Sequence, residues 1–186
     1  QIGFTTGVIE NGIGWIIKEN AGNILYTVGH ETKKKKQMKR VDNMIDTSGL
    51  RDFIRSNALK ANNRSTGDTA RAKEFSGGSL QLISATNSNP FRNFSVQYGF
   101  IDDFEAVKDS SADGNIRRVI EQRFASYYSK MKLFYISTPK TKTGSNIEPV
   151  YEMGDKRKYH IPCPCCGSLI ALEWSTPSKI VEGGMA

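Results

Sequence analysis

Three short apolar segments, each followed closely by small polar or acidic residues, constrain the fold of this chain most strongly. They are NILYTV at 23–28, VQYGFI at 96–101 and KLFYI at 132–136. Short and nearly continuous apolar runs of this kind are typical of strands buried on both faces. Segments with helical periodicity lie between them. The alternation predicts an α/β domain with a largely parallel sheet.

The rest of the chain supplies the connecting elements of such a domain. The 186 residues are enough for one core and a small appended module, and we find no internal repeat and no low-complexity segment. We expect helices at 5–18, 31–46, 48–59 and 115–131, a hairpin at 73–86 around Gly77–Gly78, a polar loop at 60–72, and short strands at 159–161 and 169–174.

The charge of the chain favours a polyanionic partner. The formal charge is +7, with 26 Lys and Arg against 19 Asp and Glu, and much of the excess lies in Lys33–Lys36, Lys39 and Arg40. A basic group that neutralises a phosphate releases counterions, so nucleic acid is a natural partner. A solvated helix face with no partner is the alternative reading of this run.

The sequence predicts no membrane span, because no apolar run approaches the roughly 20 residues that a spanning helix needs. The chain begins at Gln1 without an initiating Met, and it ends at Gly183–Gly184–Met185–Ala186 without a recognisable stop. We therefore expect both ends to continue in a longer protein.

Two acidic residues follow the apolar run at 96–101, and they are the first candidate for a chemical site. Ligands of open α/β sheets bind at the carboxyl ends of the strands, where Asp102 and Asp103 are expected. Nucleotide hydrolysis needs one carboxylate near Mg²⁺ and a second that orients or deprotonates water. Adjacent acids at a strand end can supply both, although a solvated strand-to-loop turn is the alternative.

Hydroxyl residues follow the next apolar run. Ser137 and Thr138 come directly after 132–136, and Pro139 ends the strand because it has no N–H to donate. At the same sheet edge as the two aspartates, these hydroxyls could face the γ-phosphate of a nucleotide. An ordinary strand exit is the alternative.

The first residues of the chain, QIGFTT, lead into the first expected helix. Gly3 and Thr5 could end a phosphate-binding loop, because backbone N–H groups at a helix start bind phosphate and a Thr hydroxyl can ligate Mg²⁺. Phe4 stands where such a loop normally has Lys. A plain helix start is therefore the alternative.

All three cysteines lie within four residues, in the run Cys163-Pro-Cys-Cys-Gly167. Cys163 and Cys166 have the C-x-x-C spacing of one half of a zinc-binding knuckle, and Gly167 permits the tight turn. Such a cluster suits metal thiolates in a reducing cytosol better than a disulfide framework. No later Cys or His follows, so His160 and Cys165 are the possible additional ligands in this chain, and a free dithiol is the alternative.

Four stretches together resemble the large terminase subunits of the lambda-like family of tailed bacteriophages. They are QIGFTTGVIEN, FSGGSLQLISATNSNPFRNFSVQYGFIDDFEAV, IEQRFASYYSKMKLFYISTPKTKTGSNIEPVYEMGDKRKYHIPCPCCG and LIALEW. The run from KLFYI through STPKTKTGSNI to KYHIPCPCCG is the most specific. The resemblance covers most of the chain outside residues 30–72.

The resemblance implies a RecA-like ATPase core of the additional-strand type, which moves viral double-stranded DNA into a procapsid. This motor domain would occupy 1–158, lacking its first strand and the start of its phosphate loop, and 159–186 would begin a cysteine module of zinc-ribbon type. The implied cofactors are ATP, Mg²⁺ and, through the cysteines, Zn²⁺. The implied partners are viral DNA, the terminase small subunit, the portal of the procapsid and further copies of the chain. The implied location is the host cytoplasm, and transiently the portal vertex.

Residue roles also follow from the resemblance. The implied phosphate and nucleotide contacts are Gly3, Thr5, Thr6, Ser137, Thr138 and Arg92. Thr5 and Asp102 are the implied Mg²⁺ ligands, and Asp103 is the implied catalytic carboxylate. Cys163 and Cys166 are the implied half site for Zn²⁺.

The sequence departs from the family pattern at three points. Asp103 stands where the family usually has Glu, so Glu105 is a further candidate for the catalytic carboxylate. Phe4 replaces the phosphate-loop Lys, which in some relatives lies further upstream and here would fall before Gln1. The family's nuclease domain would lie beyond Ala186.

Two other functions stay open at this level. One is another RecA-like ATPase of helicase type, which would lack the junction between STP and CPCCG. The other is a non-catalytic zinc protein that binds nucleic acid through the basic helix and the cysteines. ATPase turnover and zinc content distinguish these functions.

Overall fold

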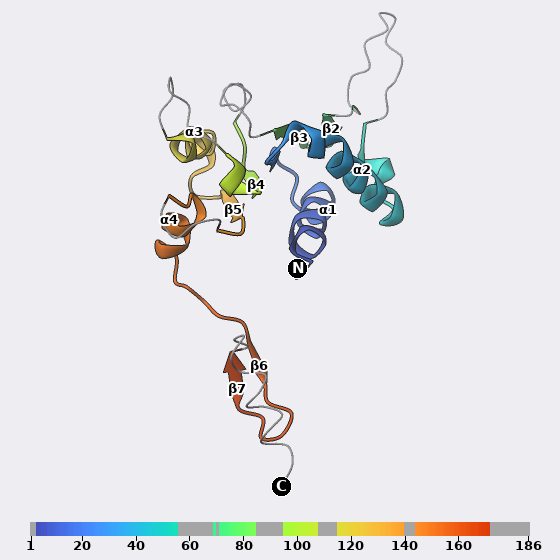
Figure 1. Ribbon diagram of the computed structural model, residues 1–186. Helices are drawn as coiled ribbons and strands as arrows, with labels where there is room; N and C mark the ends of the chain where they lie inside the picture. Colours follow the sequence, from blue (N-terminus) through green and yellow to red (C-terminus); the bar gives the residue numbers. More distant parts are fainter. Residues whose placement is uncertain are drawn as a thin grey trace, which may run out of the picture. The chain divides into compact units, whose positions relative to one another are not determined.

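The computed structural model of the chain describes residues 3–55, 69, 71–84, 95–107, 115–139 and 144–171. The chain divides into two compact units, 1–148 and 149–186. The first holds a five-stranded sheet of order β2-β3-β1-β4-β5, and the second holds the two-stranded sheet β6-β7 (Figure 1). Within the described residues, no helix is both long and apolar enough to cross a membrane.

The larger sheet is mostly parallel, as the alternation of apolar segments predicts. Its central strand β1 pairs in parallel with β3 on one side and β4 on the other, and β4 pairs in parallel with β5. The hairpin expected around Gly77–Gly78 is present, because β2 runs antiparallel to β3. The strands are β1 (Ile24–Val28), β2 (Ala72–Phe75), β3 (Gly78–Ser84), β4 (Tyr98–Asp102) and β5 (Lys132–Ile136).

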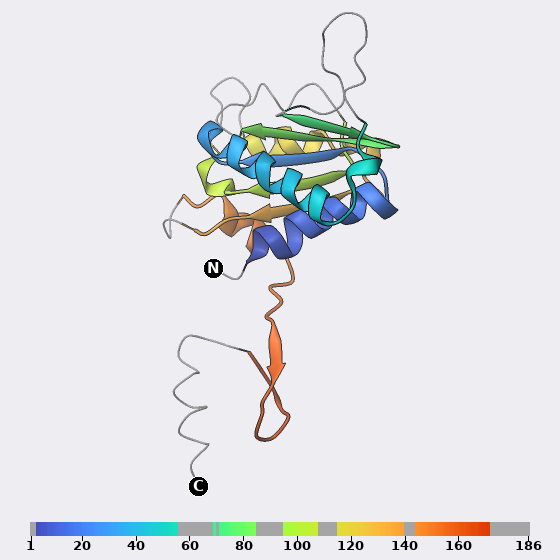
Figure 2. The same cartoon turned by 90° about the vertical axis from the view of Figure 1, so that its right-hand side faces the viewer.

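Helices cover both faces of this sheet (Figure 2). One face carries the π-helical turn η1 (Thr5–Glu10), α1 (Asn11–Glu19) and α2 (Glu31–Thr47), and the other carries α3 (Ile116–Gln122). Tyr26 and Phe100 belong to the core under α1 and α2. A Cβ added at Gly12 of α1 would come within 2.8 Å of the Phe100 ring, so this glycine lets α1 approach β4 closely.

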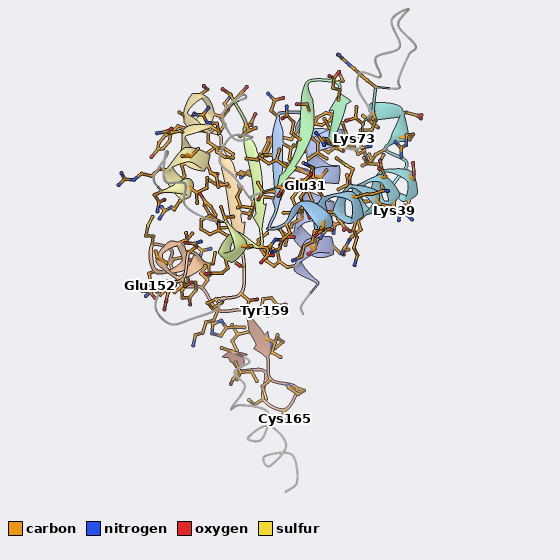
Figure 3. The ribbon with its side chains drawn as sticks, turned by 45° about the horizontal axis from the view of Figure 1, so that its top comes forward. Glu31, Lys39, Lys73, Glu152, Tyr159 and Cys165 are labelled. Carbon is orange, nitrogen blue, oxygen red and sulfur yellow. The ribbon has the colours of Figure 1, made fainter. Side chains whose placement is uncertain are left out.

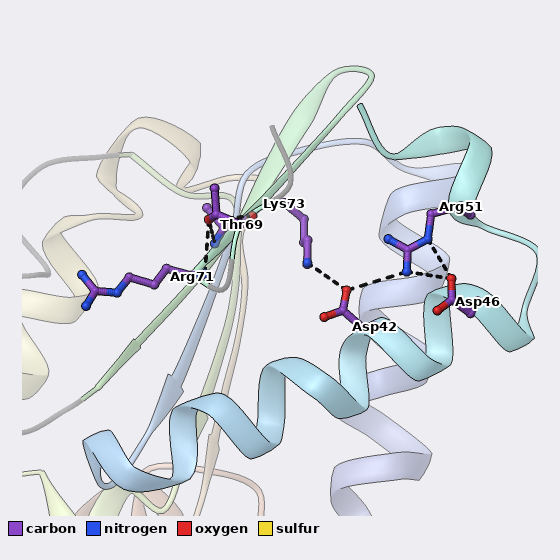
Figure 4. Close-up of polar contacts among 7 residues, drawn as sticks. Asp42, Asp46, Arg51, Thr69, Arg71 and Lys73 are labelled. Carbon is purple, nitrogen blue, oxygen red and sulfur yellow. Dashed lines mark hydrogen bonds and ion pairs between the residues drawn. The ribbon is translucent and has the colours of Figure 1, made fainter. Parts of the chain in front are cut away.

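An ionic network fixes the second half of α2 to the edge of the sheet (Figure 4). Lys73 of β2 is only 3% exposed, and its Nζ lies 2.8 Å from Asp42 Oδ1. Arg51 lies 3.8 Å from the same carboxylate and 2.6 Å from Asp46 Oδ1. A buried ammonium needs such partners because desolvation penalises its charge.

The helix expected at 48–59 is wrong over the part that the structure describes. Helix α2 ends at Thr47, and Gly49, whose φ of +66° is left-handed, permits the turn that returns Leu50 to the core. Only a 3-10 turn, η2 (Arg51–Phe53), follows, and Ile54 then pairs with Phe75 of β2 as an isolated bridge. Burial of apolar residues around the turn therefore ends the helix.

The helix expected at 115–131 is also too long. Helix α3 ends at Gln122, and the chain continues through turns and η5 (Ala125–Tyr127) to β5. Phe124 is fully buried against Gly99 of β4, where a Cβ would lie 2.5 Å from its ring. This contact, together with the bond from Val96 N–H to the Arg123 carbonyl (3.0 Å), fixes the chain direction after the helix.

Three further elements complete the described chain. Helix α4 (Ile147–Glu152), which the sequence pattern did not indicate, crosses the division between the units. Strands β6 (His160–Pro162) and β7 (Leu169–Ala171) form the antiparallel pair around the cysteines. The predicted continuation of this second strand to residue 174 lies outside the described residues.

Candidate nucleotide site

The two aspartates and the two hydroxyl residues come together at one edge of the sheet, as predicted. Asp102 ends β4 and is the register partner of Ile136, the last residue of the parallel strand β5. Ser137 and Thr138 follow Ile136 directly. Both pairs therefore leave the sheet at the carboxyl ends of neighbouring strands, where parallel sheets bind ligands.

Asp102 lies on the face of the sheet that carries η1, α1 and α2. Side chains alternate along a strand, so Asp102 shares the face of Phe100, which packs in the core with α1. Burial, followed by the nearby charge of Asp103, raises the pKa of Asp102, whereas the positive charges of Lys33 and Arg40 lower it. The carboxylate therefore lies in a confined polar environment.

The phenol of Tyr26 lies in the same environment. Its hydroxyl is buried, and among the described residues it makes no hydrogen bond of normal geometry. The Asp102 carboxylate is nevertheless near enough to act on it, because desolvation first and the charge of Asp102 second raise the Tyr26 pKa. A buried hydroxyl without a well-formed hydrogen bond is uncommon in folded proteins.

Asp103 has a left-handed backbone, with φ +59°, and it directly precedes the short turn η4 (Phe104–Ala106). This conformation is uncommon for a residue other than glycine and often marks functional sites. Its Oδ2 accepts a hydrogen bond from Lys33 Nζ in the first turn of α2, at 2.9 Å. A Cβ added at Gly29 would lie 2.4 Å from the same oxygen, so the end of β1 approaches Asp103 very closely.

Glu105 is already engaged in hydrogen bonds that organise the following segments. Its backbone N–H donates to Ser137 Oγ (3.0 Å), which links the turn after β4 to the end of β5. Its carboxylate accepts from Ser145 Oγ and from Ile147 N–H, the latter at 3.0 Å. These contacts hold the start of α4, and a catalytic role for Glu105 stays a prediction.

The predicted end of the phosphate loop opens the helical segment at the same edge. Figure 2 shows the N-terminal end of η1 on the side of the sheet where β4 leads into η4. Gly3 has φ +68°, and its carbonyl accepts from Gly7 N–H at 2.8 Å. Thr5 and Thr6 begin a π-helical turn, a rare geometry that is frequent at functional sites.

Arg40 of α2 connects to this π-helical turn. Its Nε donates to Glu10 Oε1 at 2.6 Å, and its Nη2 donates to Thr6 Oγ1 at 2.8 Å. The Glu10 side chain is only 11% exposed, so its carboxylate depends on this partner. Arg92, the remaining predicted nucleotide contact, lies outside the described residues.

In the second unit, Cys163 and Cys166 belong to the turn between β6 and β7, where Figure 3 labels Cys165. The turn is closed by two 2.8 Å backbone bonds, from Gly167 N–H to the Cys163 carbonyl and from Cys163 N–H to the Ser168 carbonyl. Hydrogen bonds from Ser168 and then the Cys163 thiol lower the pKa of Cys166. Among the described residues, no three His, Cys, Asp or Glu side chains gather as a metal site.

Comparison with known proteins decides the family. A family model described as "Phage terminase large subunit gpA, ATPase domain" matches residues 1–182. The chain belongs to the phage terminase large subunit ATPase family. Comparison with curated proteins gives no match. Among solved structures, the Thermus phage P74-26 large terminase ATPase domain is similar, with a TM-score of 0.57 and 12% identity over 92% of this chain and 69% of that one. At this identity the structural likeness supports the fold.

The residues at the sheet edge of this terminase ATPase domain suit the cofactor that the family implies. Magnesium prefers oxygen ligands, and the Asp102 carboxylate and the Thr5 hydroxyl are oxygen donors from the end of β4 and the start of η1, which lie on the same side of the sheet (Figure 2). Lys33 and Arg40 add positive charge on the same side. The donor set therefore fits a magnesium nucleotide.

Sequence reasoning missed several residues that lie around the candidate site. Lys33 and Arg40 were predicted only as members of a basic run, and nothing assigned Gly29, Glu10 or Tyr26. The positions of Lys33 and Arg40 on a helix that follows a buried strand are a usable signal, because such a helix starts at the ligand-binding edge. The contacts of Glu10 and Tyr26 depend on tertiary packing and leave no local pattern.

Proposed function

We propose that this domain is the ATP-hydrolysing motor that moves viral double-stranded DNA into the procapsid. The observation that carries the proposal is the meeting of Asp102–Asp103 and Ser137–Thr138 at the ends of β4 and β5, beside the start of η1. ATP hydrolysis depends mainly on positioning and charge stabilisation, which such an edge can supply.

Each residue has a separate task in this proposal. The Asp102 carboxylate and the Thr5 hydroxyl would hold Mg²⁺, which offsets phosphate charge when it is bound. The backbone from Gly3 to Thr6 would bind phosphate at the helix start. Ser137 and Thr138 would respond to the γ-phosphate and link hydrolysis to movement, and Arg92 would add a further positive charge.

Asp103 would orient the attacking water and accept its proton. Its carboxylate is hydrogen-bonded to Lys33 at 2.9 Å, and both side chains are partly exposed, so the pair can rearrange at low cost. Glu105 is the second candidate for the catalytic carboxylate, although its side chain is hydrogen-bonded to Ser145 and Ile147.

The proposal includes a RecA-like core of the additional-strand type. Strand β5 is an edge of the described sheet, and Phe134 within it is 39% exposed. An edge strand presents unpaired N–H and C=O groups with which a further strand can pair. We infer that the strand leading into the phosphate loop pairs with β5, and that the motor domain extends over 1–158.

The proposed partners follow from the family and from the basic face of α2. Lys35, Lys36 and Lys39 are exposed, and among the described residues they take part in no ion pair, so they are available to DNA phosphates. Figure 3 labels Lys39 on this helix. The terminase small subunit, the portal and further copies of the chain complete the proposed assembly. The proposed location is the host cytoplasm and, transiently, the portal vertex.

The cysteine module at 159–186 is proposed to bind Zn²⁺ as half of a site. Cys163 and Cys166 are hydrogen-bonded to each other within one turn, which suits two adjacent thiolate ligands. A second pair of ligands would have to come from outside this chain.

Hydrolysis by the full-length protein tests the proposed function. Asp102→Asn is expected to lower Mg²⁺-dependent ATP turnover more than about 100-fold, because a neutral amide is a poor ligand for a hard cation. Arg118→Gln on α3, on the opposite face of the sheet, is the control and should retain turnover. Wild-type protein without ATPase activity would instead favour the non-catalytic zinc protein.

A further inference from the structure

The guanidinium of Arg40 links α2 to η1 by hydrogen bonds. Arg40 comes from the middle of α2, and it reaches Glu10 and Thr6 of η1 at 2.6 and 2.8 Å. Its charge also acts on Tyr26 of β1 and on Asp102 of β4. Arg40 is therefore the point at which α2 meets the predicted phosphate-binding turn.

The donors of Arg40 are shared between two acceptors on η1. A guanidinium has five N–H donors, and the buried carboxylate of Glu10 accepts from Nε. Nη2 donates to the Thr6 hydroxyl, which is exposed and adjoins Thr5, the proposed Mg²⁺ ligand. The planar guanidinium can hold two acceptors in a fixed geometry, which an ammonium cannot do.

The sequence of η1 provides no local side chain that would stabilise its first turn. Phe4 stands where a phosphate loop normally carries Lys, and this residue is 38% exposed. The turn is π-helical, and neither the side chain of Phe4 nor any first-turn acid caps it. Its geometry therefore depends on contacts from another element.

We propose that Arg40 is a positioning residue for nucleotide binding, which holds Thr6 and Glu10 so that the first turn of η1 keeps its phosphate-binding form. The inference rests on the proposed ATPase function. It assigns to α2 a role at the site in addition to its basic outer face. Arg40 acts through Thr6 and is not required to touch the nucleotide.

The test measures ATP hydrolysis and the binding of a fluorescent ATP analogue by the full-length protein with Mg²⁺. Arg40→Gln is expected to raise KM and the dissociation constant of the analogue about tenfold, with a smaller change in kcat, because the binding turn is no longer preorganised. Arg40→Lys should recover part of this loss. Arg118→Gln serves as the matched control and should leave both constants unchanged.

A double-mutant cycle separates positioning from a general loss of stability. Thr6→Val alone should weaken binding, and adding it to Arg40→Gln should weaken binding little further, because both changes remove the same contact. Additive effects, or an Arg40→Gln protein that melts earlier but keeps its KM, would overturn the inference. A wild-type protein that neither binds nor hydrolyses ATP would reject the proposed function itself, and the inference with it.

Discussion

The sheet unit and the cysteine unit bury very different amounts of their apolar side chains. In the sheet unit, both faces of β1 and β4 are covered, and residues such as Ile24, Tyr26 and Phe100 are at most 2% exposed. In the described part of the cysteine unit, 149–171, no residue is fully buried, and Leu169 is 71% exposed. Burial of apolar surface therefore stabilises the first unit, whereas the second needs another source of stability.

The same difference applies to the two candidate sites, because each is supported by the packing of its own unit. The candidate nucleotide site lies at the ends of strands that the core holds in register, so the positions of its aspartates and hydroxyls follow from the packing of the sheet. The cysteine turn stands on two three-residue strands. Small modules of this kind usually depend on a metal or a cross-link.

Core substitutions should give the largest contrast between the units. Phe100 is 2% exposed and stacks on Phe134 with a ring-centroid distance of 5.4 Å, so Phe100→Ala should destabilise the sheet unit by about 3–5 kcal/mol. Leu169→Ala should change the free energy of unfolding by no more than about 0.5 kcal/mol. Denaturant unfolding of both variants measures this, and equal losses would show that β7 is buried in the protein.

Substitution of Asp103 is expected to have a smaller effect, which is confined to ATP turnover. Asp103→Asn should slow ATP turnover about 100-fold or more while nucleotide binding stays largely intact, because its proposed role is on the water. Asp103→Glu restores the acid usual in the family and should keep activity. Turnover and analogue binding are measured together, and a loss of binding equal to that of Asp102→Asn would contradict the separate roles.

The cysteines should have the smallest effect on the sheet unit. Cys163→Ser should remove zinc from a longer protein that carries the second ligand pair, without changing ATP turnover by more than about twofold. The chain 1–186 should retain zinc weakly, because two thiolates leave the ion open to chelators. Metal analysis after dialysis against a chelator tests both statements. Stoichiometric zinc in chain 1–186 would show that His160 or Cys165 completes the site.

The strands were predictable from the sequence because each is a compact apolar run with a polar end. The prediction for 132–136 matches β5, and the aspartates follow β4 at the expected sheet edge. The lengths of two helices were not predictable. Helix α2 stops at Thr47, and the turn at Gly49 lets Leu50 enter the core, whereas α3 stops so that Phe124 can pack against Gly99. The ends of both helices therefore depend on packing against residues that are distant in the sequence, which helical periodicity does not reveal.

The site was predictable to the extent that it follows strand ends. The pairing of Lys33 with Asp103 and of Arg40 with Glu10 joins residues far apart in the sequence. From the sequence alone, every lysine in a basic run on a helix is expected to be solvated. Only the fold shows which basic residues of the helix contact other elements. Helix α4 was missed for a similar reason, because Glu105, which accepts from the backbone N–H of Ile147, is distant from it in the sequence.

The close approach of Gly29 to Asp103 has a consequence for how this protein can vary. A single methyl group at position 29 would lie 2.4 Å from the Asp103 carboxylate and 2.7 Å from the Cβ of Ala106. Selection that maintains Asp103 must therefore also act on a residue that carries no chemistry. A larger residue at position 29 is therefore expected to displace the Asp103 carboxylate or the η4 turn, so the glycine and the acid should vary together.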